Sequence, residues 1–402
     1  MSAMEKELRC LAGYSDHTLG IDIPVMAASL GAVVIEKHFT LDKEMNGPDH
    51  KASVDPLELK EMIRQIREKK EIEIPDEIMG DGIKRPTPDE IDIMKVAKVL
   101  VTGGAGFIGS HIVDILIEND YDVVIVDNLS TGNKANINPK ARLYEVDITN
   151  ILLRDVFKKE KPDFVIHEAA QINVRKSVTE PVFDAITNIV GTIELLECCK
   201  DFKVKKIVYA GSGGACYGEP EQLPCDEKHA VNPVSHYGVS KHAAEHYFFL
   251  YNYLYKIDYV ILRYSNVYGP RQDPKGEAGV ISIFLARINE DKKPQIFGDG
   301  EQTRDYVFVG DVARANLLAL EKETKSTIFN IGTGKETSVN ELYALIKKAT
   351  ETEIIAEHTD PIPGEVQKIS LDCSLVEKDL GWIPKVDIES GINQTVEWFN
   401  RK

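Results

Sequence analysis

Cysteine is scarce in this sequence, and its spacing suits neither a metal site nor a disulfide framework. The 402 residues contain six cysteines, of which only Cys198 and Cys199 are adjacent, and no Cys-x-x-Cys pair occurs. Zinc sites and disulfide-stapled secreted domains need cysteines at short, paired spacings. The scattered pattern therefore indicates a reducing, cytoplasmic location.

The chain also lacks long apolar runs and has a deficit of positive charge, and both features limit the partners that we expect it to bind. No apolar run approaches the ~20 residues of a membrane-spanning helix, and the start of the chain, M-S-A-M-E-K-E, lacks the apolar segment of a signal peptide. Positive charge is in deficit, because 48 Lys and Arg face 65 Asp and Glu, for a net charge of −17. Such a chain repels nucleic acid and anionic membranes, so we expect neither as a partner.

What the chain does contain is a glycine-rich turn between a strand and a helix. Residues 99–111 read V-L-V-T-G-G-A-G-F-I-G-S-H. This pattern predicts a buried strand, a tight turn at Gly103, a close backbone approach to a pyrophosphate at Gly106, and close packing of the helix at Gly109. Free N–H groups of the first helical turn would face the phosphates.

An acidic residue follows at the position where a dinucleotide site needs one. The next β-branched run, 123–126, ends at Asp127, eighteen residues after Gly109. A carboxylate there can accept hydrogen bonds from both ribose hydroxyls of NAD and would repel the 2′-phosphate of NADP. The sequence therefore predicts NAD as the cofactor.

Later strands predict the rest of the cofactor cleft. Residues 128–132 form a polar turn that can line the adenosine, and the strand expected at 143–148 carries Asp147, where it could meet the adenine amino group. After the strand at 163–167, Ala169 and Ala170 provide the small surface needed where a cofactor crosses a strand end. With further strands at 205–210 and 259–263 alternating with helical patterns, we expect a parallel doubly wound (Rossmann) sheet.

The first 93 residues do not belong to this nucleotide-binding pattern. They predict two strand–helix pairs, with strands near 13–18 and 33–40 and helices near 23–30 and 57–70. Residues 71–92, rich in charge and with three prolines, predict a linker. We therefore expect a partial βαβα segment ahead of the Rossmann domain.

A tyrosine and a lysine supply the candidate chemistry. Tyr237 and Lys241 stand four residues apart on a helix expected after Pro233, so they share one face. A lysine ammonium beside a phenol favours the phenolate, which lowers the tyrosine pKa toward neutrality and makes it a base. Ser212, 25 residues upstream at a strand end, offers a hydroxyl.

These motifs together identify a resemblance. The words TGGAGFIGSH, DNLS, HEAAQ, YGVSK, RYSNVYGPRQ, FGDGEQTRDYVFVGDVA and FNIGTG resemble those of the extended short-chain dehydrogenases, specifically the NAD-dependent nucleotide-sugar epimerases, with UDP-glucose 4-epimerase the nearest activity. The resemblance covers residues 95–402. It implies an NAD-binding domain at 94–267, with 307–335 returning to it, and a smaller nucleotide-sugar domain at 268–306 and 336–402. It also implies a homodimer.

The resemblance assigns roles to single residues. Tyr237 would be the base, Lys241 would tune it and hold the nicotinamide ribose, and Ser212 would bond the sugar hydroxyl. Substrate contacts would come from Ser212, Tyr237, Asn266, Arg304 and Ile369, with Arg304 on the phosphates. The implied cofactor contacts are Gly103, Gly106, Phe107, Ile108, Gly109, Asp127, Asn128, Asp147, Ile148, Ala169, Ala170, Asn188, Tyr237, Lys241 and Tyr264.

Residues 1–93 carry a second resemblance. GYSDHT, VIEKHFTLD, GPDHKAS and GIKRPTPDE resemble words of the sialic acid synthase family, in which they belong to the end of a TIM barrel and the two histidines bind a divalent metal. Here these are His17 and His38, with Asp49 nearby. A barrel site is assembled from the loops of all eight strands, so we expect no functioning metal site and interpret both histidines as relics. A true fusion and a gene end joined to its neighbour both remain open.

Two positions bear on the substrate: Ile362 departs from the epimerase pattern and concerns the nucleotide, whereas Ile369 concerns the sugar. Ile362 stands where the family usually has a phosphate-binding arginine, in Arg-x-Gly-Asp or Arg-x-Gly-Glu. Ile369, five residues after Gly364, would face the C2 substituent of the sugar, where a side chain smaller than tyrosine admits an acetamido group; the alternative is a plain apolar strand residue. A choice between UDP-glucose, its N-acetyl form and UDP-glucuronate therefore stays open.

Other functions on the same scaffold are less well supported. Sugar 4,6-dehydratases that resemble this chain carry an Asp-Glu pair after the catalytic Ser or Thr, whereas glycines and an alanine follow Ser212 here. A catalytically idle NAD-binding protein would not need Tyr237, Lys241 and Ser212 together. A sialic acid synthase would need the missing strands. The sequence therefore favours C4 epimerisation.

Overall fold

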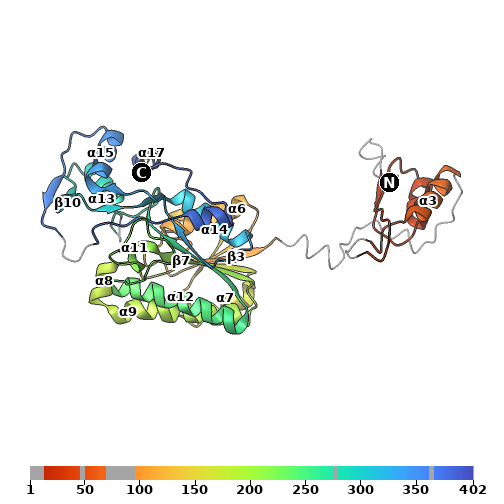
Figure 1. The fold of residues 1–402 in the computed structure, drawn as a ribbon, viewed down its shortest axis with the longest axis horizontal. Helices are drawn as coiled ribbons and strands as arrows, with labels where there is room; N and C mark the ends of the chain where they lie inside the picture. Colours follow the sequence, from red (N-terminus) through yellow and green to blue (C-terminus); the bar gives the residue numbers. More distant parts are fainter. Residues whose placement is uncertain (1–12, 46–49, 69–95, 276–278, 362–365, 402) are drawn as a thin grey trace. The chain divides into compact units, whose positions relative to one another are not determined.

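The chain divides into two units. The computed structural model describes residues 13–45, 50–68, 96–275, 279–361 and 366–401. Compactness separates Met1–Met94 from Lys95–Lys402, and Figure 1 shows both as ribbons. The five cysteines within the described residues are free thiols.

The first unit has the predicted order of strand, helix, strand, helix. Its elements are β1 (Tyr14–Asp16), α2 (Asp22–Ser29), β2 (Ile35–Lys37) and α3 (Pro56–Glu68). The two strands pair in parallel, with Tyr14 opposite Ile35. Across this pair Lys37 Nζ lies 2.6 Å from an oxygen of Asp16, and both side chains are buried. Residues 69 and 70 of the predicted second helix, and the predicted linker at 71–92, lie outside the described residues.

The second unit is built on a seven-stranded sheet. Its strands are β3 (Lys98–Thr102), β4 (Asp122–Asp127), β5 (Arg142–Glu145), β6 (Phe164–His167), β7 (Lys206–Ser212), β8 (Asp258–Tyr264) and β13 (Ile328–Ile331). Their order is β13-β8-β7-β6-β3-β4-β5, and each neighbouring pair is parallel. The predicted doubly wound sheet is confirmed.

Helices cover both faces of this sheet (Figure 1). On one face pack α6 (Phe107–Glu118) and α14 (Val309–Glu321). On the other pack α7 (Leu152–Glu160), α10 (Gly191–Asp201) and α12 (His236–Tyr255). Residues along each strand alternate between the two cores: Val99 and Val101 join the first, Leu100 the second. Burial on both faces explains why the strands read as continuous β-branched runs.

Short elements connect this framework near the C-terminal edge of the sheet. They are η1 (Lys134–Asn136), α8 (Val174–Thr179), α9 (Pro181–Ala185), the π-helical turn η2 (Ile186–Val190) and α11 (Gly213–Cys216). The turn η2 continues from α9 into α10 without a break.

The smaller elements surround a third apolar core. They are β9 (Asn266–Tyr268), α13 (Val280–Asn289), β10 (Gln295–Phe297), β11 (Thr303–Arg304), β12 (Tyr306–Phe308), β14 (Thr337–Ser338), α15 (Val339–Thr350), β15 (Glu357–Thr359), α16 (Ser374–Leu380) and α17 (Ile388–Asn400). Of these, α16 packs against β13 and shares the first core of the sheet. The domain limits inside this unit stay a prediction.

One predicted strand end is wrong. The strand expected at 143–148 ends at Glu145, so Asp147 lies in the turn beyond it. The cause is local: Asp147 Oδ1 accepts hydrogen bonds from the backbone N–H of Thr149, at 2.8 Å, and from its hydroxyl, at 2.7 Å. An aspartate that bonds the backbone two residues onward favours a turn over a strand.

Because the sheet, its two cores and the third apolar core all lie within residues 95–402, this unit should fold alone. We expect a protein beginning at Met94 to stay soluble and to keep the thermal midpoint that the second unit shows in the full chain. Differential scanning calorimetry of both proteins tests this. Aggregation of the shortened protein, or a clear fall in its midpoint, would show that residues 1–93 complete the fold.

Candidate active site

The candidate cofactor site begins where the strand order reverses, between β3 and β6. Gly103 follows β3 with a φ of +69°, and a Cβ added there would lie 2.8 Å from the backbone N of Ala169, just beyond β6. Only glycine accommodates both the left-handed backbone and this close approach. Ligands of doubly wound sheets bind at such a reversal.

The turn after β3 presents the start of α6 to this cleft. Gly106 caps the helix, and its N–H donates to the carbonyl of Gly103 at 3.0 Å. A Cβ on Gly109 would stand 2.2 Å from that same carbonyl oxygen. Phe107 and Ile108, the first helical residues, pack with the apolar cores. The first turn of a helix has unpaired N–H groups, so this glycine cradle fits a pyrophosphate.

Asp127 closes the nucleotide side of the cleft. Its side chain is 7% exposed, and its oxygens accept from the backbone N–H of Ala105, at 2.9 Å, and of Leu129, at 2.8 Å. Burial raises the pKa of Asp127, while these two hydrogen bonds act in the opposite direction. A carboxylate has about four acceptor positions, so two remain for the ribose hydroxyls of NAD.

The adenine side of the predicted site is held by polar contacts. Asn128 Nδ2 donates to Asp147 at 2.6 Å, so these two predicted residues do meet. Although burial acts the other way, hydrogen bonds from Thr149 and Asn128 keep the pKa of Asp147 below its ordinary value. Ile148 is buried and packs on Gly191, which leaves its backbone as the part that can reach a cofactor.

The side-chain amide of Asn188, a predicted cofactor contact, is hydrogen-bonded to protein groups through both its oxygen and its nitrogen. It lies in η2 and is buried. Its amide oxygen accepts from Gln171 N–H at 2.7 Å, and its amide nitrogen donates to the carbonyl of Gln171, to Asp184 and to the Ser240 hydroxyl. Asn188 thereby ties the segment after β6 to the helix that carries the predicted base.

That helix, α12, begins with a side-chain cap. The hydroxyl of Ser235, two residues before Tyr237, accepts from the N–H of Gly238 at 3.1 Å and caps the helix, which starts at His236. The backbone N–H of Tyr237 donates to the Ser177 hydroxyl at 3.1 Å. A Cβ on Gly238 would lie 2.5 Å from the carbonyl oxygen of Ala215, so α12 packs tightly against α11.

Ser212 stands at the junction of β7 and α11. Its hydroxyl caps α11 by accepting from the N–H of Ala215 at 3.3 Å. Because α11 is the element against which α12 packs, the fold brings Ser212 and the start of α12 to the same part of the cleft.

Lys241 is 3% exposed, and its Nζ lies 4.4 Å from the ring centre of Tyr209 in β7. Burial lowers the pKa of Lys241, and the negative charge of Glu168 is the strongest influence that raises it again. Glu168 is a functional candidate that the sequence reading missed. The only signal was a charged residue inside H-E-A-A-Q, a stretch otherwise suited to lining a cofactor.

The predicted substrate residues come from the smaller elements. Asn266 pairs with Tyr306 between β9 and β12, and its N–H donates to the carbonyl of Asp305 at 2.9 Å. Arg304 immediately precedes Asp305, so the fold brings both predicted residues together. The amide oxygen of Asn266 lies 3.7 Å from where a Cβ on Gly214 would stand, which places it beside the turn that holds Ser212.

Two backbone carbonyls accept hydrogen bonds from Arg304. Its Nη1 donates to the carbonyl of Thr303 at 2.8 Å and to that of Gln367 at 3.4 Å. A guanidinium also presents several N–H donors that can bond phosphate oxygens. Residues 362–365, which include the position Ile362, lie outside the described residues.

Ile369 is 2% exposed and forms a small apolar cluster with Tyr217, Cys225 and Leu371. This placement favours the interpretation as a packed apolar residue. Its predicted contact with the sugar stays a prediction.

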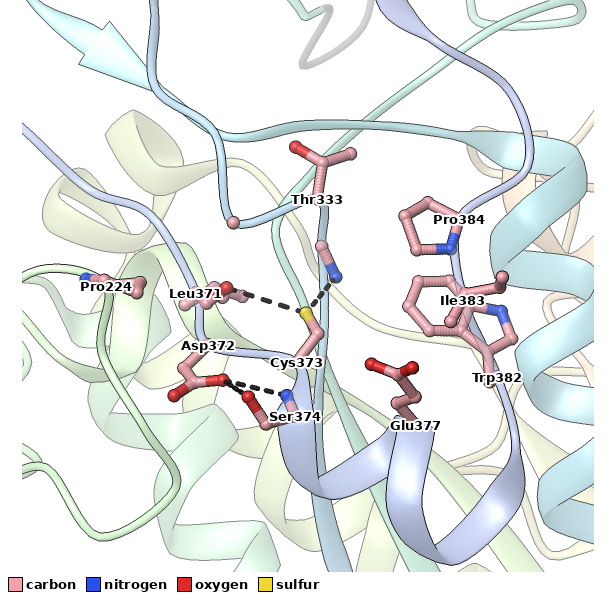
Figure 2. A pocket seen from close by; sticks show the side chains of 12 residues that line it. Pro224, Thr333, Leu371, Asp372, Cys373, Ser374, Glu377, Trp382, Ile383 and Pro384 are labelled. Atoms are coloured by element: carbon pink, nitrogen blue, oxygen red, sulfur yellow. Dashed lines mark hydrogen bonds between the residues drawn. The ribbon is translucent and has the colours of Figure 1, made fainter.

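A separate pocket of about 250 Å³ lies beside β13, and Figure 2 shows its lining. Its walls are the loop after β13, segment 371–374, α16 and residues 382–384. At its centre Cys373 Sγ accepts from Gly332 N–H at 3.1 Å. Its described lining includes none of the predicted site residues, but Leu371 also packs on Gly213, so the pocket backs onto the Ser212 turn.

In the first unit the two predicted histidines do lie together. The rings of His17 and His38 are 5.0 Å apart, centre to centre. Among the described residues there is no group of three or more His, Cys, Asp or Glu side chains able to hold a metal ion. The third candidate, Asp49, lies outside the described residues.

Comparison with known proteins decides the family. Residues 99–332, more than half of the chain, match the model of the NAD dependent epimerase/dehydratase family. The chain belongs to this family. Residues 1–76 match the NeuB family, which confirms the second resemblance. NAD as cofactor and the epimerase class of enzyme, both predicted from the sequence, are confirmed at the level of this family.

Individual relatives carry related names. A Methanocaldococcus jannaschii protein provisionally named UDP-glucose 4-epimerase is 57% identical over 75% of this chain and 98% of its own length. The crystal structure of a Thermotoga maritima UDP-glucose 4-epimerase with UDP-glucose has a TM-score of 0.74 and 47% identity, over 76% of this chain and 99% of that one. A Methanobrevibacter ruminantium UDP-N-acetylglucosamine 4-epimerase has a TM-score of 0.72 and 36% identity, over 77% and 99%.

None of the helices within the described residues has the length and apolar character needed to cross a membrane.

The glycine cradle yields a test that does not depend on turnover. We expect Gly109→Ala to lose tightly held NAD and to lower stability by roughly 1–3 kcal/mol, because the new methyl group overlaps the carbonyl of Gly103. Absorbance of cofactor released on denaturation, together with thermal melts, measures both effects. Gly214→Ala is the matched control, since its Cβ would make only an ordinary contact in the same cleft. Normal cofactor content in Gly109→Ala would contradict the assignment.

Proposed function

We propose that this protein is an NAD-dependent C4 epimerase of a UDP-hexose that works through a 4-keto intermediate. The observation that carries the proposal is the convergence of Tyr237 and Lys241 on α12, Ser212 at the end of β7, and the glycine cradle at Gly103–Gly109 on one edge of the sheet. The names of the relatives support the same reaction class.

The chain's own residues handle the proton and the nucleotide. The phenolate of Tyr237, which the ammonium of Lys241 stabilises, takes the proton from the C4 hydroxyl and becomes a neutral phenol. The hydroxyl of Ser212 bonds the same sugar oxygen and orients it. NAD, when bound, provides the acceptor for the hydride from C4 and the donor that returns it. Gly103, Gly106 and Asp127 would hold that cofactor.

Inversion requires the keto sugar to present its other face. We propose that Asn266 and Arg304 keep the nucleotide in place while the sugar turns about its phosphate link. Arg304 suits this task because a guanidinium can bond two phosphate oxygens at once. The nucleotide therefore acts as the anchor during the part of the cycle in which the sugar is loosely held.

The sugar itself is proposed as UDP-glucose and UDP-galactose, following the names of two of the relatives reported above. UDP-N-acetylglucosamine is the second candidate, because one structural neighbour carries that name. The buried position of Ile369 means that Ile369→Tyr would disturb packing whatever the substrate is. Substrate comparison with the unaltered protein is the better test.

We expect the protein to interconvert UDP-glucose and UDP-galactose, and Tyr237→Phe to lower kcat by about 10²–10⁴-fold because the base is lost. Separate incubations with UDP-glucose, UDP-N-acetylglucosamine and UDP-glucuronate, read by ¹H NMR of the C4 epimers, identify the sugar. Cofactor content of Tyr237→Phe is the control, and it should match that of the wild type. Near wild-type turnover in this variant would refute the role of the base.

We also propose a homodimer, formed through the outer face of α12. Apolar side chains there are exposed at helical spacing, among them Val239, Phe249 and Tyr253. The neighbouring elements α9 and η2, which contact α12, expose Val182 and Ile186. The apolar stripe exposed on α12, α9 and η2 needs a partner to cover it. A second copy of the chain, related by a two-fold axis, can cover it with the same surface.

A charged substitution on this face of α12 tests the proposed dimer. We expect Phe249→Glu, at a position 59% exposed, to convert a dimer into a monomer in light-scattering measurements, because a carboxylate cannot be buried unpaired. Ile355→Glu is the matched control, since Ile355 is 70% exposed and lies outside α12, α9 and η2. A monomeric wild type, or a Phe249→Glu protein that remains a dimer, would refute this interface.

A further inference from the structure

A carboxyl group with no role in the proposed chemistry lies at the edge of the sheet where the predicted cofactor site begins. Glu168 follows the last residue of β6, at the strand reversal, and is part-buried. Its Oε1 accepts a hydrogen bond of 2.8 Å from the hydroxyl of Tyr264, the last residue of β8. The carboxyl group is therefore aimed across the edge of the sheet, over the end of β7.

The direction of the hydrogen bond between Tyr264 and Glu168 is set by Asn316, which also contacts Tyr264. Asn316 Nδ2 donates both to the Tyr264 hydroxyl, at 2.7 Å, and to the carbonyl of Val312, at 3.0 Å. Since that carbonyl can only accept, the amide nitrogen must face this side. The Tyr264 oxygen thus accepts from Asn316, and its own proton points to Glu168, which is held as an acceptor.

Lys241 faces several titratable groups, from every element packed around it. They are Asp184 of α9, His167 and Glu168 at the end of β6, Tyr209 of β7, Cys216 of α11, and Tyr237 and Glu245 of α12.

Three of these groups cannot balance the charge of Lys241. Burial lowers the pKa of His167 to about 3 and raises that of Cys216 to about 12, so both are neutral at pH 7. Glu245 is bound bidentately by Arg263, at 2.9 and 2.6 Å. Asp184 accepts from the uncharged amides of Gln171 and Asn188, so its negative charge adds to the larger influence of Glu168.

We propose that Glu168 is a positioning residue that keeps Lys241 protonated, and through it sets the pH range in which Tyr237 can act as a base. The inference rests on the proposed function for the roles of Lys241 and Tyr237. A lysine that is 3% exposed tends to lose its proton, because the charged form is poorly solvated. Burial raises the pKa of Glu168 to about 7, so above that pH its carboxylate, fixed by Tyr264 as an acceptor, supplies the opposing negative charge.

The competing explanation is that Glu168 only anchors Tyr264. Glu168→Gln separates the two roles, because the amide oxygen can still accept from Tyr264 while the charge is gone. Tyr264→Phe is the complementary variant, since it removes the anchor and keeps the carboxyl group.

The experiment is the pH dependence of kcat for the holoenzyme and three variants. We expect Glu168→Gln to move the alkaline limb, where Lys241 loses its proton, to lower pH by about one unit or more. Glu168→Asp should restore part of the shift, and Tyr264→Phe should move the limb less than Glu168→Gln does. A Glu168→Gln profile that differs from the wild type only by a constant factor would overturn the proposal.

A second readout does not need turnover. In protein labelled with ¹³C-lysine, the Cε signal missing from Lys241→Met identifies Lys241, and its titration gives the pKa directly. We expect a lower midpoint in Glu168→Gln than in the wild type, and an unchanged midpoint overturns the proposal. Absence of epimerase activity in the wild type would refute the proposed function, whereas the NMR titration would still decide the coupling between Glu168 and Lys241. Thermal melts check that each variant is folded.

Discussion

The second unit depends on close backbone packing at the turn after β3. The turn after β3 runs between the start of α6 and the segment after β6, so closely that a methyl group on Gly103 or Gly109 would overlap a neighbouring backbone atom. This contact fixes the distance between the helix and the two strands at the reversal. The cofactor cradle, the position of Asp127 at the end of β4, and the location of Glu168 all follow from it. Side chains larger than hydrogen would separate the layers and open the cleft.

Around this turn the fold concentrates polar groups at the edge of an otherwise apolar sheet. His167 shows how they are kept neutral: Thr192 donates its proton to a backbone carbonyl at 2.6 Å, so its oxygen must accept from the imidazole, which in turn accepts from Thr102. Directed chains of this kind satisfy each buried group without creating charge. Lys241 and Glu168 titrate among these neutral groups, so a charge on one of them acts on the other with little screening.

The fold could be predicted where sequence patterns are local. Continuous β-branched runs located the strands, and the glycine spacing located the cradle, because both depend on neighbouring residues alone. Asp147 was misplaced as a strand end, since a side-chain turn outweighed the apolar pattern before it. Ile369 could not be judged from sequence, because its burial comes from Tyr217 and Cys225, about 150 residues away. Glu168 was missed for the same reason: its partners, Tyr264 and Lys241, meet it only through the order of the strands.

The π-helical turn η2 has a consequence for how this site tolerates insertion and deletion. Each residue of an α-helix advances the side-chain direction by about 100°, so the wider turn at Ile186–Val190 changes the phase between α9 and α10. That phase lets Asn188 reach Gln171, Asp184 and Ser240 at once. Loss of a single residue here would leave a more regular helix, yet it would rotate Asn188 away from α12. The π-helical turn therefore sets the rotation of α10 relative to α9, and a regular α-helix would not preserve that rotation.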